Sequence, residues 1–416
     1  MGETFKAVAP EIGGLATLVA DLGADAIAAG NFINKNGPAA DWLHGPIIDD
    51  LLAPVRVAAD ATFKRMGDIG IQTVETGSEL NRAAWLYHDS DRRTYEALNQ
   101  HKVNLANRDV AVPVLVDQEA AGYAKPYEGS VSYAKPEKAE LDEPQANKED
   151  TAGLIGEVFP VLDNVNEAIK SITRIAGHEI DVLGEALKPI PGNWSEVRRI
   201  GESYKIAGNA MEACGKNLES GVNRVDQHWD GKAAIAFSSW AQAQIAAMKW
   251  EGPVGRVIGD ALGVVADKIR NAVKTIITKV WELLESRVKI GSLSDAIKVI
   301  AKKIPVVGTA AEIADIGRRL VNIITTAIDL VKTIEVLRDR VKTLLEVVSD
   351  PVGQARDKAK AKLDQVIEPV TSAIDDATKK AAIAKDVAEI AQLNHTLDRP
   401  KTDYEVGAGT QPWDNA

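Results

Sequence analysis

Apolar residues recur at steps of three and four along most of this chain of 416 residues. Such a step returns a side chain to the same face of an α-helix, whereas a half-buried β-strand needs strict alternation. Long series of this kind occupy residues 197–229, 258–288 and 323–348. No run suggests a strand except Val110 to Val116, which could be a short extended piece. The spacing therefore predicts an all-α, elongated protein of stacked helical hairpins.

The last of these series has the 4-3 spacing of a coiled-coil seam. Such a seam favours helix partnering, either within the chain or between copies of it, and the second alternative predicts a homo-oligomer. The spacing therefore predicts helices of coiled-coil type in the C-terminal region. The seam positions are Ile323, Ala327, Leu330, Ile334, Leu337, Val341, Leu344 and Val348.

Shifts in composition divide the chain into five parts. The stretch at 109–150 contains four prolines, an acidic run and a duplicated Tyr-Ala-Lys-Pro, which begins at Tyr123 and Tyr133. It cannot hold a helix or bury much surface, so we expect a linker or a long exposed loop. The other parts are a helical hairpin at 1–108, a helical hairpin domain at 151–290, an amphipathic helical region at 291–395 and a disordered polar tail at 396–416.

Charge and motifs exclude several classes of function. The formal net charge of -11 argues against nucleic acid as a partner, because phosphate binding needs a basic face. The six His form no His-Glu-x-x-His pattern, and Cys214 lies on an apolar helix face, which predicts a buried thiol. No phosphate-binding, dinucleotide-binding or serine-hydrolase glycine motif is present. We expect a protein that is not an enzyme and holds no cofactor or metal.

The sequence predicts neither a signal peptide nor a membrane span. Glu11 and Asp21 interrupt the first apolar stretch, and no charged segment precedes it, so we expect no Sec signal peptide. No window reaches about 18 uncharged apolar residues, so we expect no conventional transmembrane helix.

The sharpest local feature is Trp229 to Gly231, which interrupts one amphipathic helix and starts another. Glycine permits the dihedral angles of a tight turn, and Asp230 can cap the next helix. Phe237 and Trp240 continue the apolar face and would support the bundle. The same pattern also fits an ordinary hairpin tip. A second copy, Trp250 to Gly252, runs into Pro253 and lacks the continuation of two alanines and a phenylalanine that follows the first copy.

With these flanks, residues 193–248 resemble the WXG100 superfamily, the helical-hairpin substrates of type VII (ESX) secretion in actinobacteria. The entry at Trp194 and the turn at Trp229 and Gly231 carry the resemblance. The family also uses an export signal, Tyr-x-x-x-Asp/Glu, which Tyr87 and Asp91 match. Positions i and i+4 share a helix face, so the ring and the carboxylate are expected side by side, as one docking epitope for a secretion ATPase.

The two signals lie on different hairpins. This arrangement is similar to PE–PPE pairs and to EspB-like proteins, in which one half carries Tyr-x-x-x-Asp and the other carries Trp-x-Gly. The resemblance implies that the fold brings the two signals together at one end of a four-helix bundle. Pro10-Glu11 is the only candidate for the family's Pro-Glu opening.

The resemblance implies a non-catalytic protein that is secreted or at the cell surface and acts there by binding or self-assembly. The implied partners are the secretion ATPase, a cytosolic chaperone and further copies of the chain. One alternative is a membrane-active effector whose amphipathic residues 291–350 bind anionic lipid or insert into the membrane as a pore. A second alternative is a non-secreted helical scaffold or a phage structural protein.

Overall fold

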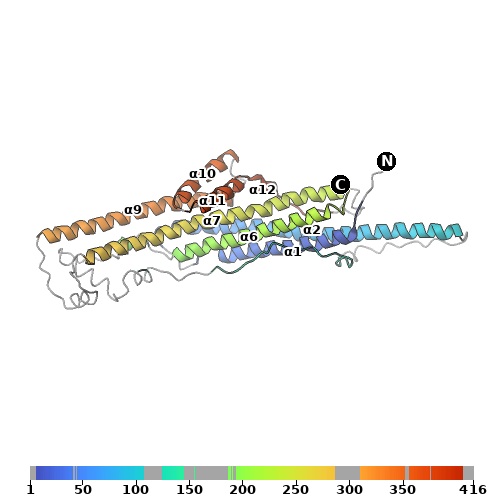
Figure 1. The fold of residues 1–416 in the computed structure, drawn as a ribbon, viewed down its shortest axis with the longest axis horizontal. Coiled ribbons are helices and arrows are strands. Elements are labelled where there is room, and N and C mark those ends of the chain that lie inside the picture. The colour runs from blue at the N-terminus through green and yellow to red at the C-terminus, as the bar shows by residue number, and fades with distance from the viewer. Residues whose placement is uncertain are drawn as a thin grey trace.

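The structure is a computed structural model and consists almost wholly of helices (Figure 1). Among the described residues, the regular elements are eight α-helices and one isolated bridge, so the all-α prediction is confirmed. The structure describes residues 6–40, 43, 45–106, 124–144, 154, 186–188, 190, 194–285, 310–351, 356–374 and 376–405.

Two helical hairpins form the centre of the molecule. Helix α1 (Ala9–Asn36) packs against α2 (Asp49–Ala106), and α6 (Trp194–Val225) packs against α7 (Lys232–Glu285). Helix α1 also packs along α6, which joins the hairpins into one elongated bundle (Figure 1). The α6–α7 turn lies where the sequence pattern predicts it.

The C-terminal helices cover one side of this bundle. Helix α9 (Ala310–Ser349) packs along α7 and α2, and it ends just before Pro351. The shorter helices α10 (Arg356–Ser372), α11 (Ala377–Ile390) and α12 (Asn394–Leu397) all contact α7 (Figure 1).

Seven of the eight coiled-coil positions in α9 are buried, and the eighth, Leu330, is half-buried. The helix packs on α7 and α2, so the partner of the seam lies within the chain. Burial inside the bundle removes the seam as an argument for homo-oligomerisation. The expected breaks at 291–292 and 305–308, and most of the helical pattern predicted at 154–188, lie outside the described residues.

Glycines let the helices within each hairpin approach backbone to backbone. A Cβ added to Gly208 of α6 would lie 2.5 Å from the carbonyl oxygen of Glu251 in α7. One added to Gly23 of α1 would lie 2.6 Å from the backbone nitrogen of Val74 in α2. Neither distance leaves room for a side chain, so these glycines set how closely the helices pack and how they align along their axes.

A buried ion pair ties the two hairpins and α9 together. The Arg65 guanidinium donates to the Glu251 carboxylate through Nε at 2.5 Å and Nη2 at 2.9 Å. Its Nη1 donates to the carbonyl oxygen of Val348 in α9 at 3.0 Å, and its carbon lies 5.2 Å from the ring centroid of Trp250. Trp250 in turn donates to the carbonyl oxygen of Ile390 at the end of α11. The second Trp-x-Gly copy therefore supplies two buried residues, Trp250 and Glu251, that connect several helices.

Two segments that we expected to be exposed or disordered pack on the bundle. Residues 124–144 of the expected linker run in extended form along the bundle (Figure 1), and Tyr127 is buried. The backbone of Glu137 exchanges two hydrogen bonds with the Asn217 side chain, at 3.0 and 2.8 Å. Residues 396–405 of the expected disordered tail also pack on the bundle, with Tyr404 only 7% exposed. Side-chain contacts with distant helices place both segments, and helical periodicity carries no information about such contacts.

By length and composition, one helix of the described part, α1, is apolar enough to cross a membrane, where we expected none. A core helix of a bundle meets the same criterion, and most of α1 packs between α2 and α6.

Substituting glycine by alanine tests the close approach. We expect Gly208→Ala to lower the free energy of unfolding by about 1–3 kcal/mol, because its methyl group meets backbone. Gly263→Ala is the matched control in the partner helix α7, since nothing lies within 4 Å of its added Cβ. That variant should gain about 0.5–1 kcal/mol from helix propensity. Urea unfolding measures both, and equal shifts of the same sign would contradict the packing.

Breaking the buried ion pair should be costly. We expect Glu251→Gln to lower the free energy of unfolding by about 3–5 kcal/mol, because the Arg65 charge then stays buried without its carboxylate. The control is Glu219→Gln, which breaks the exposed pair with Lys249 and should cost less than about 1 kcal/mol. Thermal and urea unfolding compare the two variants. Similar losses of stability would argue against a stabilising role for the buried pair of Arg65 with Glu251.

Candidate functional site

The turn between α6 and α7 is held by the N-terminal segment. Gly231 has a φ of 98°, a conformation that side chains with a Cβ rarely adopt. The Val8 amide donates to the carbonyl oxygen of His228 at 3.0 Å, and the Asp230 amide donates to that of Lys6 at 2.7 Å. These bonds flank an antiparallel bridge between Ala7 and Trp229. The start of the chain therefore fixes the position of the turn.

The structure brings the two predicted signals into contact. The indole Nε1 of Trp229 donates to the hydroxyl oxygen of Tyr87 at 3.2 Å, and the ring centroids lie 6.3 Å apart in an edge-to-face arrangement. Each residue is only 2% exposed. Burial raises the pKa of Tyr87 to about 12, although the hydrogen bond from Trp229 opposes the shift, so the phenol is neutral at physiological pH. The contact joins α2 to the α6–α7 turn.

Three more aromatic rings extend this contact along α7. Phe237 lies 5.6 Å from Trp229 and 6.2 Å from Trp240, measured between ring centroids. Tyr404, from the C-terminal segment, meets Phe237 edge to face at 5.6 Å. We call these five residues the aromatic cluster: Tyr87, Trp229, Phe237, Trp240 and Tyr404.

Asp91 is exposed, unlike the buried Tyr87 and Trp229. Residues 91–95 of α2 are all exposed, and Figure 1 shows α2 continuing beyond the end of the bundle. We expected the ring of Tyr87 and the carboxylate of Asp91 to project side by side as one epitope. Instead the ring of Tyr87 is buried against Trp229, whereas Asp91 is exposed.

The extended segment docks on the same part of α2. Asn81 Nδ2 and Trp85 Nε1 both donate to the carbonyl oxygen of Lys125 at 2.9 Å. The Tyr127 amide donates to Asn81 Oδ1 at 2.8 Å, and its hydroxyl lies 3.0 Å from His88 Nδ1. One copy of the duplicated Tyr-Ala-Lys-Pro thus lies at a docking point on α2, where the sequence pattern predicted a linker or exposed loop.

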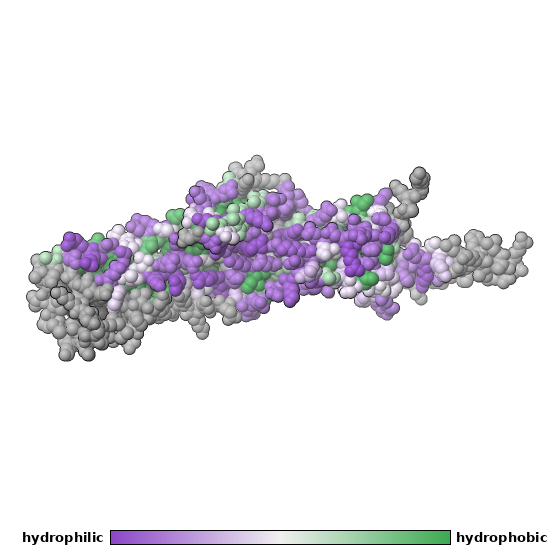
Figure 2. All heavy atoms as spheres, viewed as in Figure 1, coloured by the Kyte–Doolittle hydropathy of each residue, from purple (hydrophilic) through white to green (hydrophobic). Residues whose placement is uncertain are grey.

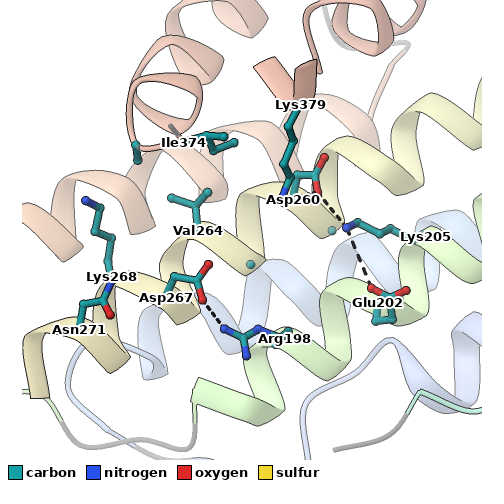
Figure 3. Close-up of a pocket in the computed structure, with 13 residues that line it drawn as sticks. Arg198, Glu202, Lys205, Asp260, Val264, Asp267, Lys268, Asn271, Ile374 and Lys379 are labelled. Carbon is teal, nitrogen blue, oxygen red and sulfur yellow. Dashed lines mark hydrogen bonds and ion pairs between the residues drawn. The ribbon is translucent and has the colours of Figure 1, made fainter. Parts of the chain in front are cut away.

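A hollow lies between α6, α7 and the C-terminal helices (Figure 3). Lys205 Nζ lies 2.8 Å and Lys379 Nζ 3.7 Å from the Asp260 carboxylate, while Arg198 pairs with Asp267. Opposite charges face one another here, so the hollow is a network of ion pairs across the helices. In the described part of the chain, no group of three or more His, Cys, Asp or Glu side chains could hold a metal ion.

Cys214 lies in the core of α6 and is fully buried. Burial raises the pKa of its thiol to about 12, so the nucleophilic thiolate is not populated at neutral pH. The residue fits a packing role.

Comparisons with known proteins give no identity. No family model, no curated protein and no solved structure matches this chain.

Removing the Tyr87 hydroxyl tests the contact between the hairpins. We expect Tyr87→Phe to lower the free energy of unfolding by about 1–3 kcal/mol, because the buried indole N–H of Trp229 loses its acceptor. Adding Trp229→Phe should cost less in the Tyr87→Phe background than in the wild type. Tyr95→Phe, at an exposed position of α2, is the control and should change little. If the two losses in free energy of unfolding simply add in the double variant, Tyr87 and Trp229 are not coupled.

Proposed function

We propose that this protein is a non-catalytic helical substrate of a type VII (ESX) secretion system, which acts by binding or self-assembly outside the cytoplasm. The observation that carries the proposal is the hydrogen bond between Tyr87 and Trp229, two residues 142 positions apart. Each motif is short and weak by itself. Two motifs that occur by chance are not expected to be in contact in an elongated bundle. A composite export signal, by contrast, requires this contact.

We infer different roles for the two residues of the proposed Tyr-x-x-x-Asp signal. Tyr87 is buried and cannot contact a secretion ATPase directly. We infer that it anchors α2 on Trp229, and that the ATPase contacts the exposed segment that begins at Asp91. The signal would then depend on the folded bundle, consistent with export as a folded unit and delivery to the cell surface or medium.

One observation favours the membrane-active alternative. Val321, Ile324 and Ile328 of α9 are 64%, 42% and 48% exposed, and their spacing places them on one face. Amphipathic helices with such faces bind lipid surfaces. Dye release from anionic vesicles that Ile324→Lys abolishes would support this function, whereas vesicles that stay intact with the wild-type chain would exclude it.

The export proposal is tested in an actinobacterial culture with its secretion ATPase intact or deleted. We expect the protein in the culture filtrate only when the ATPase is present. Asp91→Ala should abolish export without changing the melting temperature, because its carboxylate is exposed. Trp229→Ala should abolish export as well and also lower the melting temperature, by removing the anchor of Tyr87.

The matched control is Glu137→Ala. Tyr133 and Glu137 form a second Tyr-x-x-x-Glu match, which lies in the extended segment, and the hydrogen bonds between Glu137 and Asn217 use the Glu137 backbone. This variant should be exported like the wild type. Normal export of Asp91→Ala would contradict the assigned epitope, and retention in the cytosol in both strains would leave a non-secreted helical scaffold.

A further inference from the structure

The hollow between α6, α7 and the C-terminal helices has the size of a small-molecule site (Figure 3). It has a volume of about 410 Å³, and two glycines of α7, Gly259 and Gly263, form part of its lining. A Cβ added to Gly263 would meet no atom within 4 Å, so the space above this turn of α7 is open. A ligand placed there would lie directly against the helix backbone.

Two carboxylates that line the hollow are matched by cations of the chain. The Asp260 carboxylate lies 2.8 Å from Lys205 Nζ and 3.7 Å from Lys379 Nζ. The Asp267 carboxylate pairs with Arg198. A cationic ligand would have to displace these partners, so the hollow is poorly suited to a cation.

Lys268 and Asn271 are the polar side chains of the hollow that are not matched. Within the described part of the chain, neither side chain forms an ion pair or a hydrogen bond. The remaining carboxylate, Glu202, lies 4.0 Å from Lys205 and on the opposite side of the hollow from Lys268 (Figure 3). The lining thus has four cationic side chains against three carboxylates, and the unmatched charge is the ammonium of Lys268.

These two side chains fit an anionic group. Positions 268 and 271 are three residues apart in α7 and therefore share a helix face. An ammonium has three N–H donors and a side-chain amide has two, so together they can hold one carboxylate or phosphate group. Val264 and Ile374 supply an apolar part of the lining, and Figure 3 shows them beside Lys268 in the same hollow.

We propose that this hollow binds a small organic anion. Lys268 and Asn271 hold its carboxylate or phosphate group, and its apolar body packs on Val264 and Ile374. The paired charges of Asp260 and its neighbours keep the helices in place around the ligand. The inference concerns the isolated chain and does not depend on export.

Binding of 1-naphthyl phosphate, which joins one phosphate group to an apolar ring, tests the proposal by equilibrium dialysis against the full chain. We expect Lys268→Gln to weaken binding at least about tenfold, because the phosphate loses its ammonium. Gly263→Leu should abolish binding, because the added side chain starts in open space and fills the hollow. The melting temperature of Gly263→Leu should not fall, since leucine favours a helix more than glycine does.

Lys342→Gln is the matched control. Lys342 is an exposed lysine of α9 that has no ion pair among the residues described, and its loss changes the net charge of the chain by the same amount. This variant should bind the probe like the wild type. Inorganic phosphate should compete with the probe only at a concentration at least about tenfold higher, because it lacks the apolar body.

Four results would overturn the proposal. The first is a wild-type chain that does not bind the probe at about 1 mM. The second is binding that persists in a folded Gly263→Leu chain. The third is equal weakening by Lys268→Gln and Lys342→Gln, which would show that only the overall charge matters. The fourth is inorganic phosphate that competes as well as the probe itself, which would refute the organic ligand.

Discussion

The close approach of paired helices at glycine positions is the constraint on which the rest of the structure depends. At Gly208 in α6 and Gly23 in α1 the partner backbone lies where a side chain would otherwise be. Such contacts tolerate little sliding, because a shift along the axis would bring backbone against a Cβ. The axial alignment of the two helices within each hairpin is therefore set.

The alignment of the two hairpins with each other rests on polar groups buried between them. Arg65 of α2 reaches Glu251 of α7 and the last turn of α9, and Gln244 donates to the carbonyl oxygen of Ile69 and to Thr73 Oγ1. Apolar faces alone would accept several alignments of comparable burial. A buried charge accepts only the one in which it is paired, because the unpaired alternatives carry a desolvation cost of several kcal/mol. The contact of Tyr87 with Trp229 at the end of the bundle is a consequence of this alignment.

Two extended segments pack on the surface of the bundle, and both are held in the same way. Each is placed by hydrogen bonds to its backbone and by a buried tyrosine: Tyr127 beside His88, and Tyr404 on Phe237. Both segments also lie close to the proposed export signal, which leaves the exposed part of α2 from Asp91 onward as the accessible element there. Figure 2 shows that the described surface on this side is largely hydrophilic, with scattered apolar residues.

The sequence by itself determined the helices, the turn at Gly231 and the absence of the catalytic motifs, because periodicity, positive φ and motif spacing are local properties. It also pointed to Tyr87 and Trp229, through the resemblance to a family. Only the tertiary structure decided that the seam of α9 packs within the chain, that Tyr87 is buried while Asp91 is exposed, and that Trp250 and Tyr404 are core residues. These outcomes depend on contacts between residues far apart in the sequence, and a local pattern reveals that a face is apolar without revealing what covers it.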